Sequence, residues 1–311
     1  MVEYKFERIS EANLTHLITL YKNAFGINVS LDFLLKKYAT KEFGAAYIGY
    51  LAITKDNIPA AYYGVFPILS EFKSIKILCA QSGDTMTHSD HRGKGLFVVL
   101  AKKTYELAKQ ENIKFIYGFP NQNSYPGFVN KLSWKHNIDL NLYCIKVKTL
   151  PLAKAFKKII FLESFYMFYV NLICMFYKSG SFGFKNSLSY GNIGCIVHDD
   201  TFFNYKKYFE TKVLKIKEKN VWFKIDGRMW IGDIEYSTQD EFNKIINSLK
   251  RMAFFLGTNE IHFHTNPATK YDFYMQKIGK VKNTNPVGYL DLDSGIDMQE
   301  LKFQSADFDT F

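Results

Sequence analysis

Arginine is scarce in this sequence, although lysine is plentiful. Only four of the 40 basic residues are arginines, and with 30 acidic residues the net charge is +10. Direct readout of nucleic-acid bases relies on bidentate arginine, so this scarcity argues against a sequence-specific nucleic-acid reader. Scattered lysine instead produces a diffuse positive field, which attracts phosphate-bearing cofactors, anionic lipid or nucleic acid without choosing among them.

Closely spaced cysteines and an N-terminal apolar run are also missing. The four cysteines form no C-x-x-C pair; they are Cys79, Cys144, Cys174 and Cys195. Neither a zinc knuckle nor a redox pair is indicated, so we expect reduced thiols in a cytoplasmic protein that binds no metal. The sequence begins MVEYKFER, which has mixed charge and lacks the apolar run of a signal peptide, so export is not expected.

Apolar and aromatic residues, in contrast, are abundant. Hydrophobic residues make up 47% of the 311-residue chain, aromatic residues 17% and charged residues 23%. This composition excludes a disordered protein. With ~150 residues per domain, the length indicates about two domains, each large enough to bury a core.

Hydrophobic periodicity predicts an ordered succession of elements over residues 1–150. Helices are expected at 10–26 and 30–44, where apolar residues recur at helical spacing. Three apolar runs joined by tight connections follow and predict an antiparallel meander. A helix at 95–110, a strand, a short helix and a closing strand complete the first expected domain.

A linker over residues 151–195 contains the apolar segment 159–177, which is interrupted only by Glu163, Ser164 and Asn171. The segment is long enough to be considered for a membrane span. Lysines flank it and tyrosines lie within it. We therefore keep three alternatives: a buried inter-domain helix, an interfacial helix in peripheral contact with a membrane, and a true span.

Residues 196–311 are expected to form a second domain. Over 196–293 the pattern predicts strand, strand, helix, strand, helix, strand, which matches the back half of the first domain. We interpret this as a structural duplication with a degenerate second copy, and we expect the polar tail after Ser294 to be peripheral. The expected fold class is α/β (α+β), with tandem, mixed and mainly antiparallel sheets flanked by helices.

The stretch 82–96 combines a strand, a basic glycine-containing loop and the start of a helix. Gly93 and Gly95 allow the backbone to turn its N–H groups inward, and the free N–H groups of the following helix point the same way. Arg92 and Lys94 add positive charge where a pyrophosphate would bind. The stretch predicts an anion site, although it is neither a Walker A loop nor a G-x-G-x-x-G turn.

The sequence R-G-K-G-L from Arg92 to Leu96 resembles the R/Q-x-x-G-x-G/A coenzyme A loop of the GNAT acetyltransferase superfamily. The last small position of that motif is Phe97 here, which departs from the family pattern. N-Q-N-S at 121–124 resembles the family's Asn-x-x-Ala/Ser. The resemblance covers about residues 4–148, and the two-lobed arrangement is similar to that of Eis-like and FemAB-like relatives, in which one lobe is degenerate.

This resemblance implies a GNAT fold that uses acetyl-coenzyme A as co-substrate. Backbone amides at the end of the strand before the loop would hold the pantetheine arm and polarise the thioester carbonyl. The loop amides would hold the pyrophosphate. The residues implied to bind the cofactor are Thr85, Met86, Thr87, Arg92, Gly93, Lys94, Gly95, Leu96, Asn121 and Ser124.

The chemistry implied is attack of an amine on the thioester, which needs a base for the amine and an acid for the departing thiolate. Asp84 is the only acidic residue in the strand 76–87 and is the candidate base. The family's usual acid, a tyrosine seven residues after the asparagine, is Phe128 in this chain. Tyr125 and Tyr117 are the candidate substitutes, and solvent is the alternative because a thiolate has a low proton affinity.

The expected function is N-acetyl transfer to the primary amine of a small molecule. The stretches GDTMTH, RGKGLF and YGFPNQNSY resemble bacterial GNAT proteins of surface polysaccharide synthesis, so an amino sugar is the first acceptor to consider. The alternatives are FemAB-like aminoacyl transfer to a peptidoglycan precursor and a non-catalytic GNAT scaffold for binding or membrane recruitment. No motif specifies the acceptor or the oligomeric state.

Overall fold

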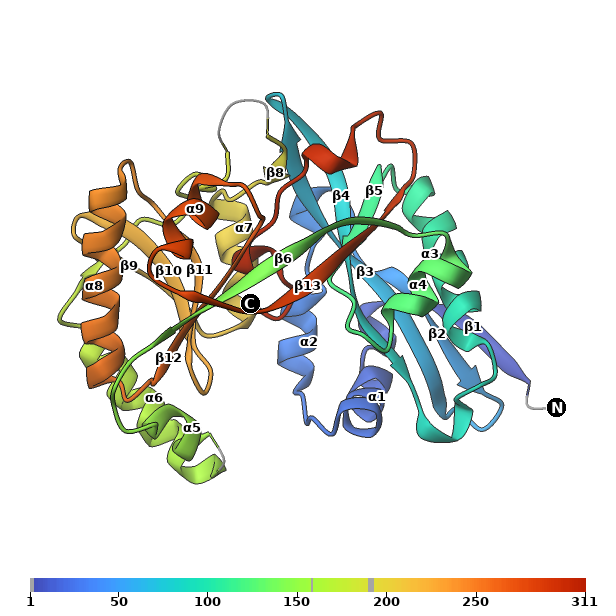
Figure 1. The fold of residues 1–311 in the computed structure, drawn as a ribbon. Coiled ribbons are helices and arrows are strands. Elements are labelled where there is room, and N and C mark those ends of the chain that lie inside the picture. The colour runs from blue at the N-terminus through green and yellow to red at the C-terminus, as the bar shows by residue number, and fades with distance from the viewer. Residues whose placement is uncertain (1–2, 158, 190–192) are drawn as a thin grey trace. The chain divides into compact units, whose positions relative to one another are not determined.

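The chain forms two compact units (Figure 1). The computed structural model describes residues 3–157, 159–189 and 193–311. The first unit comprises residues 1–137 and 286–299, and the second comprises 138–285 and 300–311. The sequence analysis places the boundary at residue 150, so it does not anticipate that a segment near the C-terminus belongs to the first unit.

The first unit is a sheet with helices on both faces (Figure 1). Its strands are β1 (Tyr4–Arg8), β2 (Ile48–Thr54), β3 (Pro59–Phe72), β4 (Ile75–Thr87) and β5 (Phe115–Gly118). Its helices are α1 (Thr15–Phe25), α2 (Leu31–Lys37), α3 (Leu96–Gln110) and α4 (Tyr125–Leu132). Short 3-10 turns lie at Glu11–Asn13, Lys41–Phe43 and Ser89–His91. β1 is a strand that the sequence pattern did not indicate.

The expected meander is confirmed, because β2, β3 and β4 pair antiparallel in chain order. β1 pairs antiparallel with β2. β5 instead runs parallel to β4, and their pairing ends at Gln81 and Tyr117. The other neighbour of β5 is the end of β13 (Lys280–Asp291), which is antiparallel to it. β4 therefore lies at the point where the sheet changes from antiparallel to parallel pairing.

Each helix of the first unit packs one apolar face against the sheet. α3 and α4 cover one side of the sheet, with Leu100, Phe128 and Trp134 in a shared buried cluster. α1 and α2 cover the other side, where Leu17 and Leu34 belong to a second cluster. Full burial of such a side chain contributes about 1.5–3 kcal/mol. The strands that carry the candidate site are thus held from both faces.

The second unit follows the same plan. Its strands are β6 (Lys135–Lys146), β7 (Lys178–Ser179), β8 (Cys195–Ile196), β9 (Thr211–Ile216), β10 (Lys219–Ile225), β11 (Met229–Ile234) and β12 (Glu260–Thr265). Its helices are α5 (Leu152–Phe156), α6 (Ile160–Cys174), α7 (Asp200–Tyr205), α8 (Gln239–Phe255) and α9 (Lys270–Gln276). Further 3-10 turns are Lys206–Tyr208, Met298–Glu300 and Ser305–Asp307.

The two units resemble each other more closely than the sequence pattern indicates. β9, β10 and β11 form an antiparallel meander, and β12 runs parallel to β11 as β5 does to β4. β9, which the sequence analysis did not identify, completes this correspondence. β12 pairs with β6, whereas β5 pairs with β13. The closing strand of each unit therefore comes from the other half of the sequence.

The apolar segment expected at 159–177 forms α6. Tyr166, Val170 and Cys174 lie on one helical face and are buried in the core of the second unit. Among the residues that the structure describes, no helix has the length and apolar character needed to cross a membrane. One face of α6 is therefore buried, as the buried-helix alternative predicts. The opposite face does not follow that alternative.

Residues 300–311 of the C-terminal tail belong to the second unit and pack in its core, so the expectation of a peripheral tail is wrong for them. Leu301 and Phe311 are buried, and Gln304 forms a β-bridge to Thr265 of β12. The Phe311 ring lies so close to Gly232 of β11 that a Cβ there would be 2.3 Å from it. The tail therefore packs on both β11 and β12.

His198 is fully buried in the second unit between two carboxylates. Its Nδ1 lies 3.2 Å from Asp233 and its Nε2 lies 2.9 Å from Asp307. Burial alone would lower the pKa of this histidine, but the hydrogen bonds and charges of the two aspartates raise the pKa of His198 to about 9. Since the pKa is higher in the folded state than in the unfolded state, protonation of His198 stabilises the fold.

We expect the second unit to lose stability as the pH rises. The stabilisation from protonated His198 is complete below about pH 6.5, the pKa of a histidine in the unfolded chain, and is lost as the pH rises through 9. The free energy of unfolding should fall by at most roughly 3 kcal/mol over this range. Urea denaturation at several pH values measures this slope. The slope should disappear in His198→Gln and persist in His16→Gln, a control in the first unit. Stability that rises from pH 6.5 to 9 would contradict this assignment.

Candidate active site

β4 leaves regular pairing near its C-terminal end. Asp84 has a left-handed φ of 52°, and the register with β3 shifts at the same place. This is a β-bulge, a feature that bends a strand and is frequent beside active sites. Of the next three residues, Met86 is buried beneath α1, and Thr85 and Thr87 are half-buried. The bulge thus lies where β4 and β5 have already stopped pairing.

The loop between β4 and α3 exposes a row of backbone N–H groups. Gly93 and Gly95 have left-handed φ values of 74° and 75°, which other residues adopt only at a cost. In the part of the chain that the structure describes, the amides of residues 93–97 donate no hydrogen bond. A Cβ at either glycine would meet no atom within 4 Å. With Arg92 and Lys94 exposed beside it, this helix N-terminus is arranged to bind an anion.

Phe97 fills the motif position that the family pattern gives to a small residue, and α4 accommodates it. Its ring packs edge-on against Phe128 and Tyr63, with centroids 5.2 Å and 5.9 Å away. Gly127 provides the room, since a Cβ there would lie 3.2 Å from the ring. The large side chain therefore packs against α4, and the departure from the motif leaves the loop amides open.

Asn121 caps α4. Its Oδ1 accepts hydrogen bonds from the N–H groups of Asn123 and Ser124, each at 3.0 Å, and its carbonyl accepts from the N–H of Tyr125 at 2.9 Å. This turn accounts for the Asn-x-x-Ser pattern in structural terms. Cofactor binding by Asn121 and Ser124 stays a prediction.

The two candidate acids differ in exposure. Tyr117 is fully buried in β5, where its ring contacts Phe115 and Phe119. Tyr125 is half-buried at the start of α4, and its hydroxyl is hydrogen-bonded to Nδ1 of His136 at 2.9 Å. An acid must reach the reacting atoms. The geometry therefore favours Tyr125 over Tyr117.

Asp84, the candidate base, is part of a buried ion pair that the sequence analysis missed. Its Oδ1 lies 2.7 Å from Nζ of Lys37, and the two side chains are only 6% and 3% exposed. Its Oδ2 accepts a hydrogen bond from the Tyr38 hydroxyl at 3.0 Å, and burial together with the Asp84 charge raises the pKa of Tyr38 well above its usual range. The Lys37 ammonium would be buried without a counter-charge if the Asp84 carboxylate were removed. The pair thus has a structural role at the bulge, and the role of Asp84 as a base stays a prediction.

A chain of buried hydrogen bonds supports the start of the bulge. Nε1 of Trp134 donates to the Tyr105 hydroxyl at 2.8 Å, which is bonded to the Tyr63 hydroxyl at 3.1 Å, and this in turn to Oγ of Ser82 at 2.9 Å. Burial raises the pKa of both tyrosines, so they remain neutral. These residues lie far apart in the sequence, which contains no local signal for the chain.

In the second unit, the position equivalent to the glycine loop, between β11 and α8, does not offer a site for an anion. β11 and β12 diverge after Trp230, and the tail fills the space: the His264 N–H donates to Oγ of Ser305 at 2.7 Å, and the Phe308 ring stacks on His264 at 4.6 Å. α8 begins with a side-chain cap from Thr238 and with acidic residues in its first turn. An anion is therefore favoured at α3 and disfavoured at α8.

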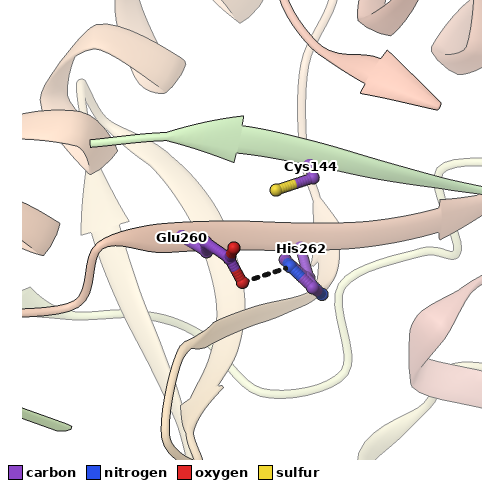
Figure 2. A group of neighbouring side chains, drawn as sticks. All are labelled: Cys144, Glu260 and His262. Atoms are coloured by element: carbon purple, nitrogen blue, oxygen red, sulfur yellow. Dashed lines mark hydrogen bonds and ion pairs between the residues drawn. The ribbon is translucent and has the colours of Figure 1, made fainter. Parts of the chain in front are cut away.

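Three side chains of the second unit lie close enough together to raise the question of a metal. Ligand atoms of Cys144, Glu260 and His262 are within 4.8 Å of one another (Figure 2). His262 is already bonded to Glu260 at 3.1 Å. Cationic groups surround the same carboxylate, namely Lys154 at 3.5 Å, Lys282 at 3.8 Å and Arg228 at 3.9 Å. This positive charge opposes a divalent cation, so we interpret the cluster as an ion-pair network.

Comparison with known proteins relates part of this chain to a family and most of the chain to solved folds. The family model described as an acetyltransferase (GNAT) domain matches residues 5–136. A search of curated proteins finds no match. Among solved structures, a GCN5-related N-acetyltransferase from Kribbella flavida has a TM-score of 0.61 at 9% identity, with 94% of this chain and 72% of that chain covered. A GCN5-related N-acetyltransferase from Anabaena variabilis has a TM-score of 0.56 at 10% identity, with coverages of 92% and 72%.

A third solved structure, a conserved protein from Enterococcus faecalis V583, has a TM-score of 0.61 at 13% identity and covers 94% of this chain and 73% of its own. At such low identities these structures establish the fold alone. Their coverage extends the likeness in fold beyond the residues that the family model matches. The family match itself contains β4, the glycine loop and α3. Residues 5–136, within the first unit of this chain, therefore match the model of a GNAT acetyltransferase domain.

Proposed function

We propose that this chain transfers the acetyl group of acetyl-coenzyme A to the primary amine of a small molecule. The observation that supports this most strongly is the row of unbonded amides at residues 93–97, at the exposed N-terminus of α3 beside two basic side chains. The pyrophosphate of coenzyme A needs such a site. The family match of residues 5–136 supports the same reaction class.

The residues of the loop fit this group. Arg92 presents a planar set of donors that matches phosphate oxygens, and Lys94 adds a second positive charge. Gly93 and Gly95 lack side chains that would keep the oxygens away from the backbone. The bound cofactor would supply an activated acetyl group as a thioester.

The ends of β4 and β5 are proposed to orient the acyl end of the cofactor. Their pairing stops at Gln81 and Tyr117, so beyond these residues the edge of β4 is not paired with β5. An extended pantetheine arm requires such an edge, whose backbone groups can form hydrogen bonds with it. The amides of residues 85–87 are the proposed donors to the thioester carbonyl. The Lys37–Asp84 pair holds the bulge and thereby positions these amides.

Tyr125 is the proposed acid for the departing thiolate. We expect Tyr125→Phe to lower kcat at least about tenfold, because the hydroxyl proton is lost, with little change in the Kd for acetyl-coenzyme A. Tyr117→Phe, in the buried strand, is the matched control and should leave kcat near the wild-type value. Thiol release under saturating cofactor measures both. Equal kcat in wild type and Tyr125→Phe would assign the proton to solvent instead.

An amino sugar of surface polysaccharide or envelope-precursor synthesis is the proposed acceptor. The support is electrostatic, since the net charge of +10 would attract the phosphates of a nucleotide- or lipid-linked sugar. Calorimetric titration with acetyl-coenzyme A tests the cofactor, and thiol release across amino sugars, aminoglycosides and polyamines tests the acceptor. Absence of binding would overturn the proposal. Binding without thiol release for any amine would favour a non-catalytic GNAT scaffold.

A further inference from the structure

The outer face of α6 is apolar and exposed to solvent. Phe168 is 70% exposed and Phe176, just after the helix, is 81% exposed. The exposed apolar residues recur at intervals of three and four and so form one stripe; they are Phe165, Phe168, Leu172, Met175 and Phe176. The opposite face is buried in the core. Among the described side chains of α6, the exposed polar residues are only Glu163, Ser164 and Asn171, so the helix lacks the broad polar side that usually faces water.

The end of α8 continues this stripe. The Tyr169 hydroxyl donates to the carbonyl of Phe255 at 2.7 Å, and the Tyr166 hydroxyl donates to the carbonyl of Leu256 at 2.8 Å. These bonds hold the end of α8 beside α6, and the side chains of Phe254 and Phe255 are exposed there. We call this set the aromatic surface; it comprises Phe165, Phe168, Leu172, Met175, Phe176, Phe254 and Phe255. Single exposed apolar residues are ordinary, whereas a contiguous set marks a binding surface.

Basic residues border the aromatic surface. A groove with a volume of about 470 Å³ is lined by Lys146, Val147, Lys148, Lys250, Arg251, Phe254 and Phe255, with no acidic residue. Among the described residues, its four basic side chains have no ion-pair partner within 4.0 Å. Lys157 and Lys178, at the two ends of α6, are paired with Asp226 and Glu218. The groove therefore carries four positive charges without a counter-charge, whereas the lysines at the two ends of α6 are paired.

We propose that the aromatic surface docks on an anionic lipid bilayer, with the basic groove on the lipid phosphates. Aromatic rings favour the membrane–water interface, and lysine and arginine at the edge of an apolar face favour anionic headgroups. α6 is too short to span a bilayer, since fifteen residues rise only about 22 Å against a hydrocarbon core of about 30 Å. The helix would therefore lie in the interface. This inference does not depend on the proposed acetyl transfer.

A second copy of the chain is a less favourable occupant. In a two-fold dimer the same patch meets itself, so the uncompensated basic groups of one copy would lie near those of the other. Like charges at such short range oppose association. A bilayer that carries phosphatidylglycerol supplies both the apolar layer and the opposite charge.

Flotation of the full chain with lipid vesicles tests the proposal. We expect binding to phosphatidylcholine vesicles that contain phosphatidylglycerol, at least tenfold weaker binding to pure phosphatidylcholine, and a loss of binding at high salt. Phe168→Gln/Phe176→Gln and Lys148→Gln/Arg251→Gln should each weaken binding at least tenfold. Ile75→Gln/Phe273→Gln, which removes two other exposed apolar side chains, should bind as wild type does.

Three results would overturn the proposal. One is a chain that stays with the soluble fraction at low salt with anionic vesicles. Another is equal binding by wild type and the Phe168→Gln/Phe176→Gln variant, with both folded by circular dichroism. The third is a dimer in light scattering that this variant converts to a monomer while vesicle binding is absent, since the aromatic surface would then be a contact between copies.

Discussion

Gly95→Glu is expected to weaken acetyl-coenzyme A binding at least about 100-fold. The substitution places a carboxylate in front of the free amides of residues 93–97, where the space is open in the structure. A hydrogen bond to a charged group contributes about 1.5–3 kcal/mol, so loss of two such bonds to the pyrophosphate accounts for a change of this size. Isothermal titration calorimetry measures the affinity.

Gly295→Glu is a matched control for backbone strain. Gly295 has a φ of 67° and, like Gly95, no atom within 4 Å of a built Cβ. A side chain at either position costs about 1 kcal/mol in the left-handed region, so the two variants should lose similar stability. Only Gly95→Glu should lose the cofactor. Equal affinity in both variants would show that the cofactor is not bound at the α3 N-terminus.

Lys37→Met is expected to destabilise the chain by about 3–5 kcal/mol. Lys37 and Asp84 are almost fully buried, with their charged atoms 2.7 Å apart, and removal of one partner leaves the other charge buried without compensation. Denaturation in urea measures the loss. Lys37→Met/Asp84→Asn should regain part of it, because neither charge is then buried alone.

The neighbouring lysine provides the control. Lys36 forms an ion pair with Asp32 at the same distance of 2.7 Å, but these side chains are 60% and 71% exposed. Exposed pairs contribute little, so Lys36→Met should change stability by no more than about 0.5 kcal/mol. Similar losses in the two variants would show that the Lys37–Asp84 pair is not desolvated in solution.

Asp84→Asn separates the two roles of this carboxylate. If Asp84 is the base, kcat should fall while the Kd for acetyl-coenzyme A changes little. If its role is to position the bulge, the displaced amides of residues 85–87 should also weaken cofactor binding. Kinetic and calorimetric measurements on a variant that remains folded decide between them.

Local features of the chain could be predicted from the sequence. The meander, α3 and the glycine loop depend on patterns within a few neighbouring residues, such as the periodicity of 95–110 and the two glycines before it. Pairing between distant segments could not be predicted in this way. β6 and β13 have similar strand patterns, and nothing within either strand specifies that it pairs in the other half of the sequence.

In the candidate site, too, local features could be predicted from the sequence and contacts between distant residues could not. Arg92, Gly93 and Gly95 could be selected from the sequence because the local shape of the loop depends on neighbouring residues, and their role in binding stays a prediction. Lys37 was missed because Lys36 and Lys37 are alike in sequence, and only the orientation of α2 buries one and exposes the other. The tail was misjudged because its polar residues look solvated, whereas the structure pairs Asp307 with His198.

The exchanged closing strands also bear on synthesis of the chain. The sheet of the first unit includes the end of β13, which pairs with β5. During translation this strand leaves the ribosome only after most of the second unit has been made. Residues 5–136, which match the GNAT domain model, must therefore wait with β5 unpaired on one side. A fragment that ends near residue 150 would retain an open sheet edge prone to aggregation.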